Sequence, residues 1–395
     1  MLIQRLLLCL YGIGTNVGLK RVSNGNNDVN YSDLRYIKRR FITPCRVREA
    51  IKHVVNQTLL LRDPLIWKGN VTVACDSKKI DVWDQNLMSQ WHARYKGTGV
   101  MVYWHVDTKS LCVYSQMKTC LSSEVASMLQ GVLHHGTDMD VQAATMDTHG
   151  QSLPGFGFSD LLHVDLLPRI KGIQREKLFL PDNNLRKDLP HLDLILDRPI
   201  DWELIRANYK ALIKYAAALQ LGTVDSDIIL KRFKNTNYQH PVYQALIELG
   251  RVIKTIFICR YLDSEDLRID INASQNIVER INGFVDFVFY GKLGEISTNR
   301  ANDQELAILC LHLLQASLVY MNTLFIQEIL ADPAWLNKLT ENDKRALTPL
   351  LHGHINPYGL FFLDMMARII VESQPASNEE QYESNISEDL CKAVC

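Results

Sequence analysis

The 395-residue sequence lacks three features that would each define a class of protein. Its nine cysteines include no CxxC pair, so neither a disulfide framework nor a zinc site is predicted, and reduced thiols are expected. Its longest apolar segment, residues 306–330, is interrupted by polar residues such as His312 and Asn322. Residues 6–10 are too short for the core of a secretory signal, and no small-residue cleavage site follows them. We therefore predict a buried helix at 306–330 and no membrane partner.

Extremes of composition and net charge are also missing. Hydrophobic residues make up 47% of the chain and charged residues 22%, which excludes a fibrous or largely disordered protein. The net charge of −1 hides an asymmetry, because residues 1–60 hold ten Lys or Arg against three acids, whereas residues 372–395 hold six acids and one Lys. The basic start and acidic end are compatible with a polyanionic partner, although a solvated helix face is the commoner meaning of a charge cluster. The acidic end predicts a disordered tail over 371–395.

A phosphate-binding loop is absent as well. Gly12, Gly14 and Gly18 resemble one, but the Lys-Ser/Thr ending is missing. We predict a glycine-rich turn between helices instead, followed by helices from residue 32 and over 44–62. Residues 1–68 are thus expected to form a helical, basic segment.

What the sequence does contain is a short strand that runs into a carboxylate. Residues 71–75 alternate with the period-two pattern of a strand, and Asp76 stands where that strand is predicted to end. A second predicted strand, 141–146, is followed by Asp147. Ligands collect beyond the carboxyl ends of strands in open α/β sheets, so both aspartates are well placed to hold a cation or a substrate phosphate.

The order of elements predicts how these two strands pair. After the first strand come a hairpin (100–106 and 111–117), a helix (121–134), the strand 141–146, a helix (153–163) and a strand (164–170). A crossover helix makes a parallel, right-handed connection, so the strands of Asp76 and Asp147 can lie side by side, about 4.8 Å apart. This order is the topology of a ribonuclease H-like mixed α/β sheet. We assign the first part of this core to residues 69–171. Its last part, together with a helical C-terminal region, is assigned to residues 271–370.

Between these parts, residues 172–270 predict an all-α insertion with a basic surface. The helix predicted over 271–281 then places Asn272, Gln275, Asn276 and Glu279 along one side. Glu279 is the candidate third ligand, and a surface decoration is the alternative.

Three gathered carboxylates suit phosphoryl transfer. Two Mg²⁺ ions about 3.5–4 Å apart activate the attacking oxygen and stabilise the leaving one, and Mn²⁺ could replace them. Asp76 would bridge both ions, with Asp147 and Glu279 each holding one. Nearby residues are candidates for contact with DNA phosphates or for orienting the attacking water, with solvated loops and helix caps as the alternatives: Lys78, Lys79, His149, Gln151 and Lys292.

Several blocks of the sequence resemble the transposases of the replicative class II transposons, the Tn-three-type family. They include LCLYGIGTNVGLKR, ACDSKKIDVWDQNLMSQWHARYKGTGVMVYWHV, MDTHGQS, ELGRVIKTIFICRYL and FYGKLGEISTNR, and the resemblance extends to about residue 368. It implies a DDE catalytic core of ribonuclease H-like fold whose acids are Asp76, Asp147 and Glu279. It also implies Mg²⁺-dependent nicking at the 3′ ends of terminal inverted repeats and strand transfer into target DNA, which gives a cointegrate.

The resemblance further implies a bacterial, cytoplasmic and nucleoid-associated protein that acts on transposon ends and target DNA as a homodimer. Members of that family are longer and carry an amino-terminal part that recognises the inverted repeats, so we expect a carboxy-terminal fragment. The surroundings of Glu279 match less closely than the other blocks, and Glu295 in GKLGEI is its competitor. A stand-alone ribonuclease H-like nuclease and a catalytically silent DNA-binding or dimerising remnant are the alternative functions.

Overall fold

The structure is a computed structural model that describes residues 2–25, 28–67, 71–83, 85–87, 89–92, 96–120, 122–233, 240–356, 358–359 and 361–367. The chain divides into a compact unit, residues 1–361, and a second unit, residues 362–395. All described helices and strands belong to the first unit. The tail that the sequence predicts to be disordered, 371–395, lies outside the described residues.

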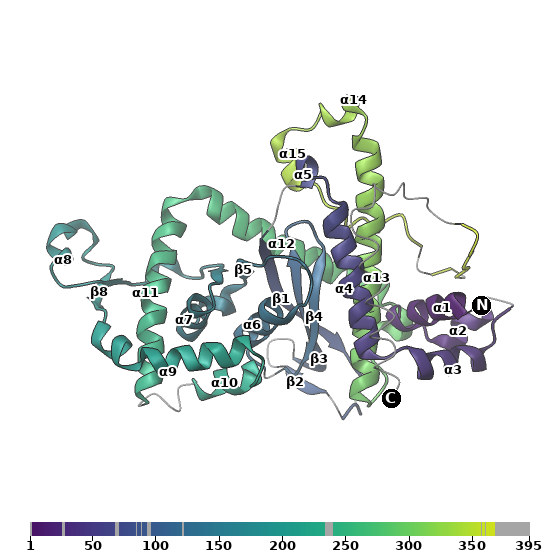
Figure 1. Ribbon diagram of the computed structural model, residues 1–395, viewed down its shortest axis with the longest axis horizontal. Coiled ribbons are helices and arrows are strands. Elements are labelled where there is room, and N and C mark those ends of the chain that lie inside the picture. Colours follow the sequence, from purple (N-terminus) through teal and green to yellow (C-terminus); the bar gives the residue numbers. More distant parts are fainter. Residues whose placement is uncertain are drawn as a thin grey trace, which may run out of the picture. The chain divides into compact units, whose positions relative to one another are not determined.

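A six-stranded mixed sheet lies at the centre of the first unit (Figure 1). Strand β1 pairs antiparallel with β3 and parallel with β5, and β5 pairs parallel with β6. The other edge of β3 pairs with β2 and β4. The strands are β1 (Thr72–Asp81), β2 (Gln90–His92), β3 (Gly97–Asp107), β4 (Cys112–Lys118), β5 (Ala143–Met146) and β6 (Asp165–Pro168). The mixed α/β class and the parallel neighbours β1 and β5 are therefore as predicted.

The end of β1 is not as predicted, because Asp76 lies in the middle of the strand. The parallel ladder with β5 stops at the pair Cys75 and Met146, but the antiparallel ladder with β3 continues to Asp81. Lysines are depleted in strands, and here the hydrogen bonds to β3 override the weak propensity of Lys78 and Lys79. Asp76 thus sits at the first position where β1 has lost its parallel partner.

Helices cover both faces of the sheet. Trp104 and His105, which are neighbours in β3, point to opposite faces. His105 packs on α6 (Glu124–His134), where its Nε2 lies 3.1 Å from the Met128 carbonyl oxygen. Trp104 meets His312 of α13 (Ala301–Leu330) edge to face, with ring centroids 6.3 Å apart. Burial lowers the pKa of both histidines to about 4, so both are neutral core residues at pH 7.

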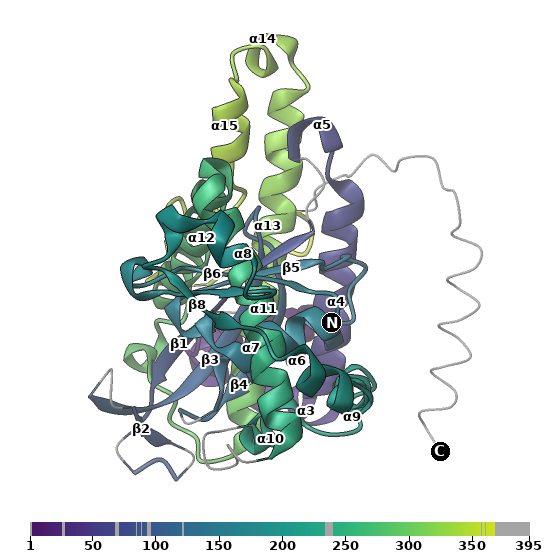
Figure 2. The ribbon, with the colours of Figure 1, turned by 90° about the vertical axis from the view of Figure 1, so that its left-hand side faces the viewer.

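Helix α13 contains the long apolar segment of the sequence. By length and composition it could cross a membrane, but 61% of its apolar window is buried inside the protein. Helix α4 (Pro44–Leu61) packs along it (Figure 1 and Figure 2). This burial is typical of a core helix, in agreement with the prediction for 306–330.

The N-terminal segment consists of helices α1 (Leu2–Gly14), α2 (Leu19–Asn24) and α3 (Tyr31–Phe41). The glycine-rich stretch joins α1 to α2 as a turn, as predicted, and both Asn16 and Gly18 adopt positive φ there, at 61° and 83°. Asparagine and glycine tolerate this left-handed region better than other residues. Seven cysteines lie in the described residues, and all seven are free thiols.

The sequence predicts an all-α insertion. The insertion is mainly helical, but it also contains two strands. A two-stranded parallel sheet, β7 (Leu178–Leu180) with β8 (Leu196–Pro199), precedes its long helices. Strands of three and four residues are too short to show a period-two pattern, so only the fold reveals them. The helices are α9 (Trp202–Gln220), α10 (Ser226–Arg232) and α11 (Pro241–Asp263), with the short η2 (Ile173–Arg175), α8 (Leu185–Asp188) and η3 (Pro190–Leu192) before them.

Helix α12 (Glu265–Val288) follows the insertion and is twice as long as the predicted helix over 271–281. Ser264 caps it by accepting a hydrogen bond from the Leu267 backbone N–H. The remaining elements are α5 (Pro64–Trp67), α7 (Leu153–Leu161), α14 (Pro333–Leu336) and α15 (Glu341–Ala346), and the 3-10 helices η1 (Thr148–Gln151) and η5 (Gly291–Gly294).

A buried ion pair joins the residue after α4 to the end of β3, and it makes the first prediction. The side chains of Arg62 and Asp107 are 8% and 1% exposed, and the carboxylate also accepts hydrogen bonds from two backbone N–H groups. Replacing Arg62 with methionine leaves the buried Asp107 carboxylate without its counter-charge, so we expect the free energy of unfolding to fall by about 3–5 kcal/mol. Chemical denaturation monitored by circular dichroism measures the change.

The matched control is Arg206→Met in α9. Its ion pair with Glu203 is 75% and 79% exposed, and exposed pairs contribute little to stability. A loss of stability at Arg62 no larger than the loss at Arg206 would contradict the assignment of the Arg62 pair as a buried structural link.

Candidate active site

The side chain of Asp76 points to the face of the sheet that α12 covers. Side chains alternate along β1, so Asp76 shares a face with Lys78. The Nζ of Lys78 lies 2.8 Å from a carboxylate oxygen of Asp286, a residue near the end of α12. Helix α12 therefore lies across the part of β1 that carries Asp76.

Asp147 directly follows β5, a strand that α12 also contacts. Thr145 of β5, two residues earlier, accepts a hydrogen bond of 3.3 Å from the Nε2 of Gln275 on α12. The last parallel pair of β1 and β5 joins Cys75 to Met146. Asp76 and Asp147 directly follow this last pair, and their meeting at one site stays a prediction.

The electrostatics of Tyr103 reflect this gathering of acids. Its hydroxyl is buried and has no hydrogen-bond partner among the described residues. Burial holds the pKa of Tyr103 well above its usual range, and the nearby ionisable groups of Cys75, Glu124, Asp76 and Asp147 raise it further. Asp76 and Asp147 thus act on the same phenol from neighbouring strands.

Glu124 is an acid that the sequence analysis missed. It lies in the first turn of α6, on the opposite face of the sheet from α12. Its Oε1 accepts a hydrogen bond of 3.2 Å from the Oγ of Ser77, the residue after Asp76. The pattern Ser-Ser-Glu signals only a helix start, so no local feature predicts the contact of this carboxylate with the strand.

Glu279 lies on the stretch of α12 between its contacts with β5 and β1. Gln275, Glu279 and Asp286 are spaced four and seven residues apart and so share one side of the helix. Gln275 meets β5 and Asp286 meets β1. Its side chain is 65% exposed, and its Oε1 lies 3.8 Å from the Nη1 of Arg169.

Arg169 is a second residue that the sequence analysis missed. It follows β6, and its backbone N–H donates to the Met146 carbonyl oxygen at 2.9 Å. Its guanidinium donates to the side-chain oxygens of Asn272 and Asn276 at 3.2 and 3.3 Å. The predicted strand 164–170 includes Arg169, whereas β6 ends at Pro168, so the rule that selected Asp147, a charged residue directly after a predicted strand, does not reach Arg169.

The competitor Glu295 lies elsewhere. Its neighbour Ile296 forms an isolated parallel bridge with Val82, and the Ile296 N–H donates to the Asp81 carbonyl oxygen at 2.9 Å. Val82 is six residues beyond Asp76 along an extended chain, which corresponds to roughly 20 Å. The structure does not bring Glu295 to the two aspartates.

The residues predicted to contact DNA have varied surroundings. Lys78 pairs with Asp286, and the Nζ of Lys79 lies 2.6 Å from Asp81. The Nε2 of Gln151 donates to the Arg169 carbonyl oxygen at 2.8 Å, so Gln151 helps to hold the strand ends. Lys292 donates to the Ser297 hydroxyl at 2.7 Å, and the side chain of His149 lies outside the described part of the structure.

The chemical type of these three side chains fits a hard divalent cation. Asp76 in β1, Asp147 directly after β5 and Glu279 on α12 offer carboxylate oxygens, the ligands that Mg²⁺ and Mn²⁺ prefer. Within the described residues, no three histidine, cysteine or acidic side chains are close enough together to hold one ion. Glu279, which faces Arg169, is therefore the residue that has to approach for all three acids to share metal.

Comparison with known proteins decides the family. The model of the Tn3 transposase DDE domain matches residues 2–361. The chain belongs to this family. Membership confirms the resemblance seen in the sequence, and a DDE domain of this family implies dependence on divalent metal in general.

Relatives of this Tn3-family chain are similar along most of its length. It is 26% identical over 355 residues to the transposase for transposon Tn1546 of Enterococcus faecium, covering 90% of this chain and 36% of that protein. It is 24% identical over 358 residues to the transposase for transposon Tn501 of Pseudomonas aeruginosa, with coverages of 90% and 36%. It is 23% identical over 351 residues to the transposase for transposon gamma-delta of Escherichia coli, covering 87% of this chain and 34% of that protein. The chain thus spans about a third of the length of these relatives.

Proposed function

We propose that this chain carries the phosphoryl-transfer site of a DNA transposase. It nicks DNA at the 3′ ends of terminal inverted repeats and joins those ends to target DNA, in the replicative reaction that gives a cointegrate. The observation that supports the proposal is that β1 and β5 pair in parallel up to Cys75 and Met146, the residues just before Asp76 and Asp147, while α12, which carries Glu279, contacts both strands.

Each acid has a role in this proposal. Asp76 is the bridging ligand, and Asp147 and Glu279 complete the ligand set from the neighbouring strand and from α12. Two bound Mg²⁺ ions, or Mn²⁺ in their place, supply activation of the attacking oxygen and stabilisation of the leaving one. No side chain of the protein then has to act as a nucleophile.

The surrounding residues position these acids. The contacts from Gln275 to Thr145 and from Asp286 to Lys78 fix α12 against the two strands. Arg169 binds the amide oxygens of α12 and the backbone of β5 at once, so it holds the helix at the ends of the parallel strands. Its charge also suits contact with the phosphate of the reacting strand.

The architecture and partners belong to the same proposal. A ribonuclease H-like core over 69–171 and 271–370, interrupted by the insertion 172–270 and preceded by the segment 1–68, accounts for the strand order. The partners are transposon inverted-repeat ends and target DNA, bound by a homodimer in the cytoplasm and associated with the nucleoid. Support comes from the family and from the excess of basic residues before residue 60.

A strand-transfer assay tests the proposal. The purified full chain is incubated with supercoiled target plasmid and labelled, pre-nicked inverted-repeat ends, in the presence of Mg²⁺, Mn²⁺ or EDTA. Because carboxylates alone do not stabilise the developing charge, we expect joined products with either metal and none with EDTA.

The other outcomes separate the alternatives. Metal-dependent cleavage without joining would indicate a stand-alone nuclease of the same chemistry. Binding of DNA without cleavage or joining in any metal would indicate a catalytically silent remnant. Joining that persists in EDTA would contradict the metal-dependent mechanism.

A further inference from the structure

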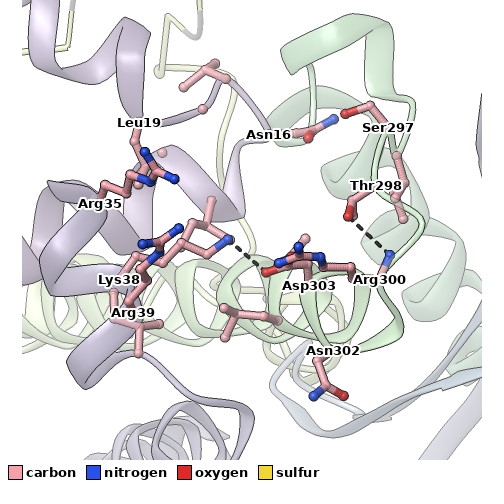
Figure 3. Close-up of a pocket in the computed structure, with 18 of the residues that line it drawn as sticks. Asn16, Leu19, Arg35, Lys38, Arg39, Ser297, Thr298, Arg300, Asn302 and Asp303 are labelled. Atoms are coloured by element: carbon pink, nitrogen blue, oxygen red, sulfur yellow. Dashed lines mark hydrogen bonds and ion pairs between the residues drawn. The ribbon is translucent and has the colours of Figure 1, made fainter. Parts of the chain in front are cut away.

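A cavity of about 640 Å³ lies between the N-terminal helices and the loop that leads into α13. Its walls come from the turn between α1 and α2, from α3, and from residues 292–307. In Figure 3, Arg35, Lys38 and Arg39 approach it from one side, and Asn16 and Thr298 face them from the other. None of the three acids of the candidate active site lines this cavity.

The cavity is strongly cationic in a protein whose net charge is −1. Its lining holds six basic side chains and a single carboxylate, Asp303, whose partner is the Nζ of Lys38 at 2.9 Å. The six are Lys20, Arg35, Lys38, Arg39, Lys292 and Arg300. Apart from Lys38, none of them forms an ion pair with any residue in the described part of the chain. Such a concentration of one sign of charge focuses attraction for an anion.

The cations also act on one another. Burial lowers the pKa of Lys292, and the positive charge of Lys38 lowers it further. A bound anion would relieve this repulsion, since it would favour the charged form of Lys292. The remaining polar lining, including Asn16, Ser297, Thr298 and Asn302, consists of amides and hydroxyls that commonly donate to phosphate oxygens.

The backbone that presents Lys292 is held in an unusual conformation. Lys292 and Leu293 both have positive φ, 53° and 59°, a region that non-glycine residues rarely adopt. Asn16 holds this loop in place, because its Nδ2 donates to the carbonyl oxygens of Gly291 and Glu295 at 2.7 and 2.9 Å. A Cβ on Gly291 would lie 2.2 Å from the Asn16 carbonyl carbon, so only glycine permits this approach. The two walls of the cavity are thus fixed to each other.

The same loop connects the cavity to the side of the active site. Lys292 lines the cavity, whereas the next residue, Leu293, lines a second pocket together with Lys78 and Lys79 of β1. Lys79 is three residues beyond Asp76, which corresponds to roughly 10 Å along a strand. A polyanion that reaches Asp76 can therefore continue past this loop into the cationic cavity.

We propose that this cavity binds the phosphodiester backbone of the duplex DNA that the active site engages, without reading its sequence. The inference takes from the proposed function only that the polyanion is DNA. Arg35 and Arg39 are the principal contacts, because they line the cavity and have no ion-pair partner among the described residues.

The test measures the affinity of the full chain for labelled duplexes of two unrelated sequences by fluorescence anisotropy over a series of salt concentrations. The double variant Arg35→Gln with Arg39→Gln is compared with the double variant Arg21→Gln with Arg40→Gln, whose residues lie in α2 and α3 but do not line the cavity. We expect the cavity variant to bind both duplexes about tenfold or more weakly. Its salt slope should fall by roughly 1–2, since each lost phosphate contact removes about 0.9. The control variant should match the wild type.

Three results would overturn the inference: equal losses in the two double variants, an unchanged salt slope, or tight binding of tripolyphosphate that depends on Arg35 and Arg39 while DNA affinity does not. Thermal unfolding of each variant shows whether it is folded. The proposed function fails separately: a wild type that binds DNA through the cavity yet joins no ends keeps this inference and loses that one. Conversely, if the cavity variant keeps both its DNA affinity and its end joining, this inference fails and the proposed function stands.

Discussion

Replacing Asp76 with asparagine is expected to reduce end joining by the full chain at least about a thousand-fold and to leave its fold unchanged. Asparagine has nearly the same shape, and the backbone pairs of Asp76 with Trp104 do not involve the side chain. The loss concerns charge, because bridging metal ligation is worth several kcal/mol in the transition state and each 1.4 kcal/mol is a factor of ten. Quantifying joined products against time gives the rate.

Asp81→Asn is the matched control for this substitution. Asp81 is on the same strand, its side chain is 64% exposed, and its partner is Lys79 and not one of the three acids. We expect the control to keep most of the joining activity. Equal activity in wild type and Asp76→Asn would remove Asp76 from the chemistry, and equal losses in both variants would reduce its role to one of stability.

Substitution of the third acid is expected to have a comparably large effect. Glu279→Gln should abolish joining, because the amide cannot supply the negative charge that complements Asp76 and Asp147. Glu295→Gln should retain activity, since Glu295 adjoins the bridge to Val82, roughly 20 Å along β1 from Asp76. The same joining assay compares the two variants.

Duplex binding by the Glu279 and Glu295 variants serves as the control for folding and DNA contact. Both should bind duplex like the wild type, since neither glutamate lines the cationic cavity. If Glu295→Gln were inactive and Glu279→Gln active, the ligand assignment would move to the loop after η5, and the role proposed for α12 would be lost.

Local patterns were enough to predict the skeleton of the sheet. The hairpin of β3 and β4 and the helix-linked strand β5 were all visible as alternation or helical periodicity, and the handedness rule then made β5 the parallel neighbour of β1. These features depend on residues close together in the sequence. The same patterns could not show where β1 ends, because its last residues are strand only through their pairing with β3.

The surroundings of the candidate site depend on contacts between distant residues, and most of these were out of reach. Lys78 and Asp286 are both ordinary surface charges in the sequence, and only the position of α12 makes them an ion pair. Arg169 and Asn272 are 103 residues apart, and no local pattern in either segment predicts their hydrogen bond. The cationic cavity likewise combines two basic segments whose proximity no local pattern encodes.

The hydrogen bonds of Asn16 have a consequence for how the protein forms during synthesis. Asn16 and Gly291 are 275 residues apart in the chain. At about 5–20 residues per second, the first helix leaves the ribosome roughly 15–55 s before the loop that it binds. Helix α4 is likewise synthesised well before α13, the helix that it packs against. Apolar side chains of both early helices are thus exposed to water during translation, which makes the nascent chain a substrate for chaperones before it can close its own N-terminal segment.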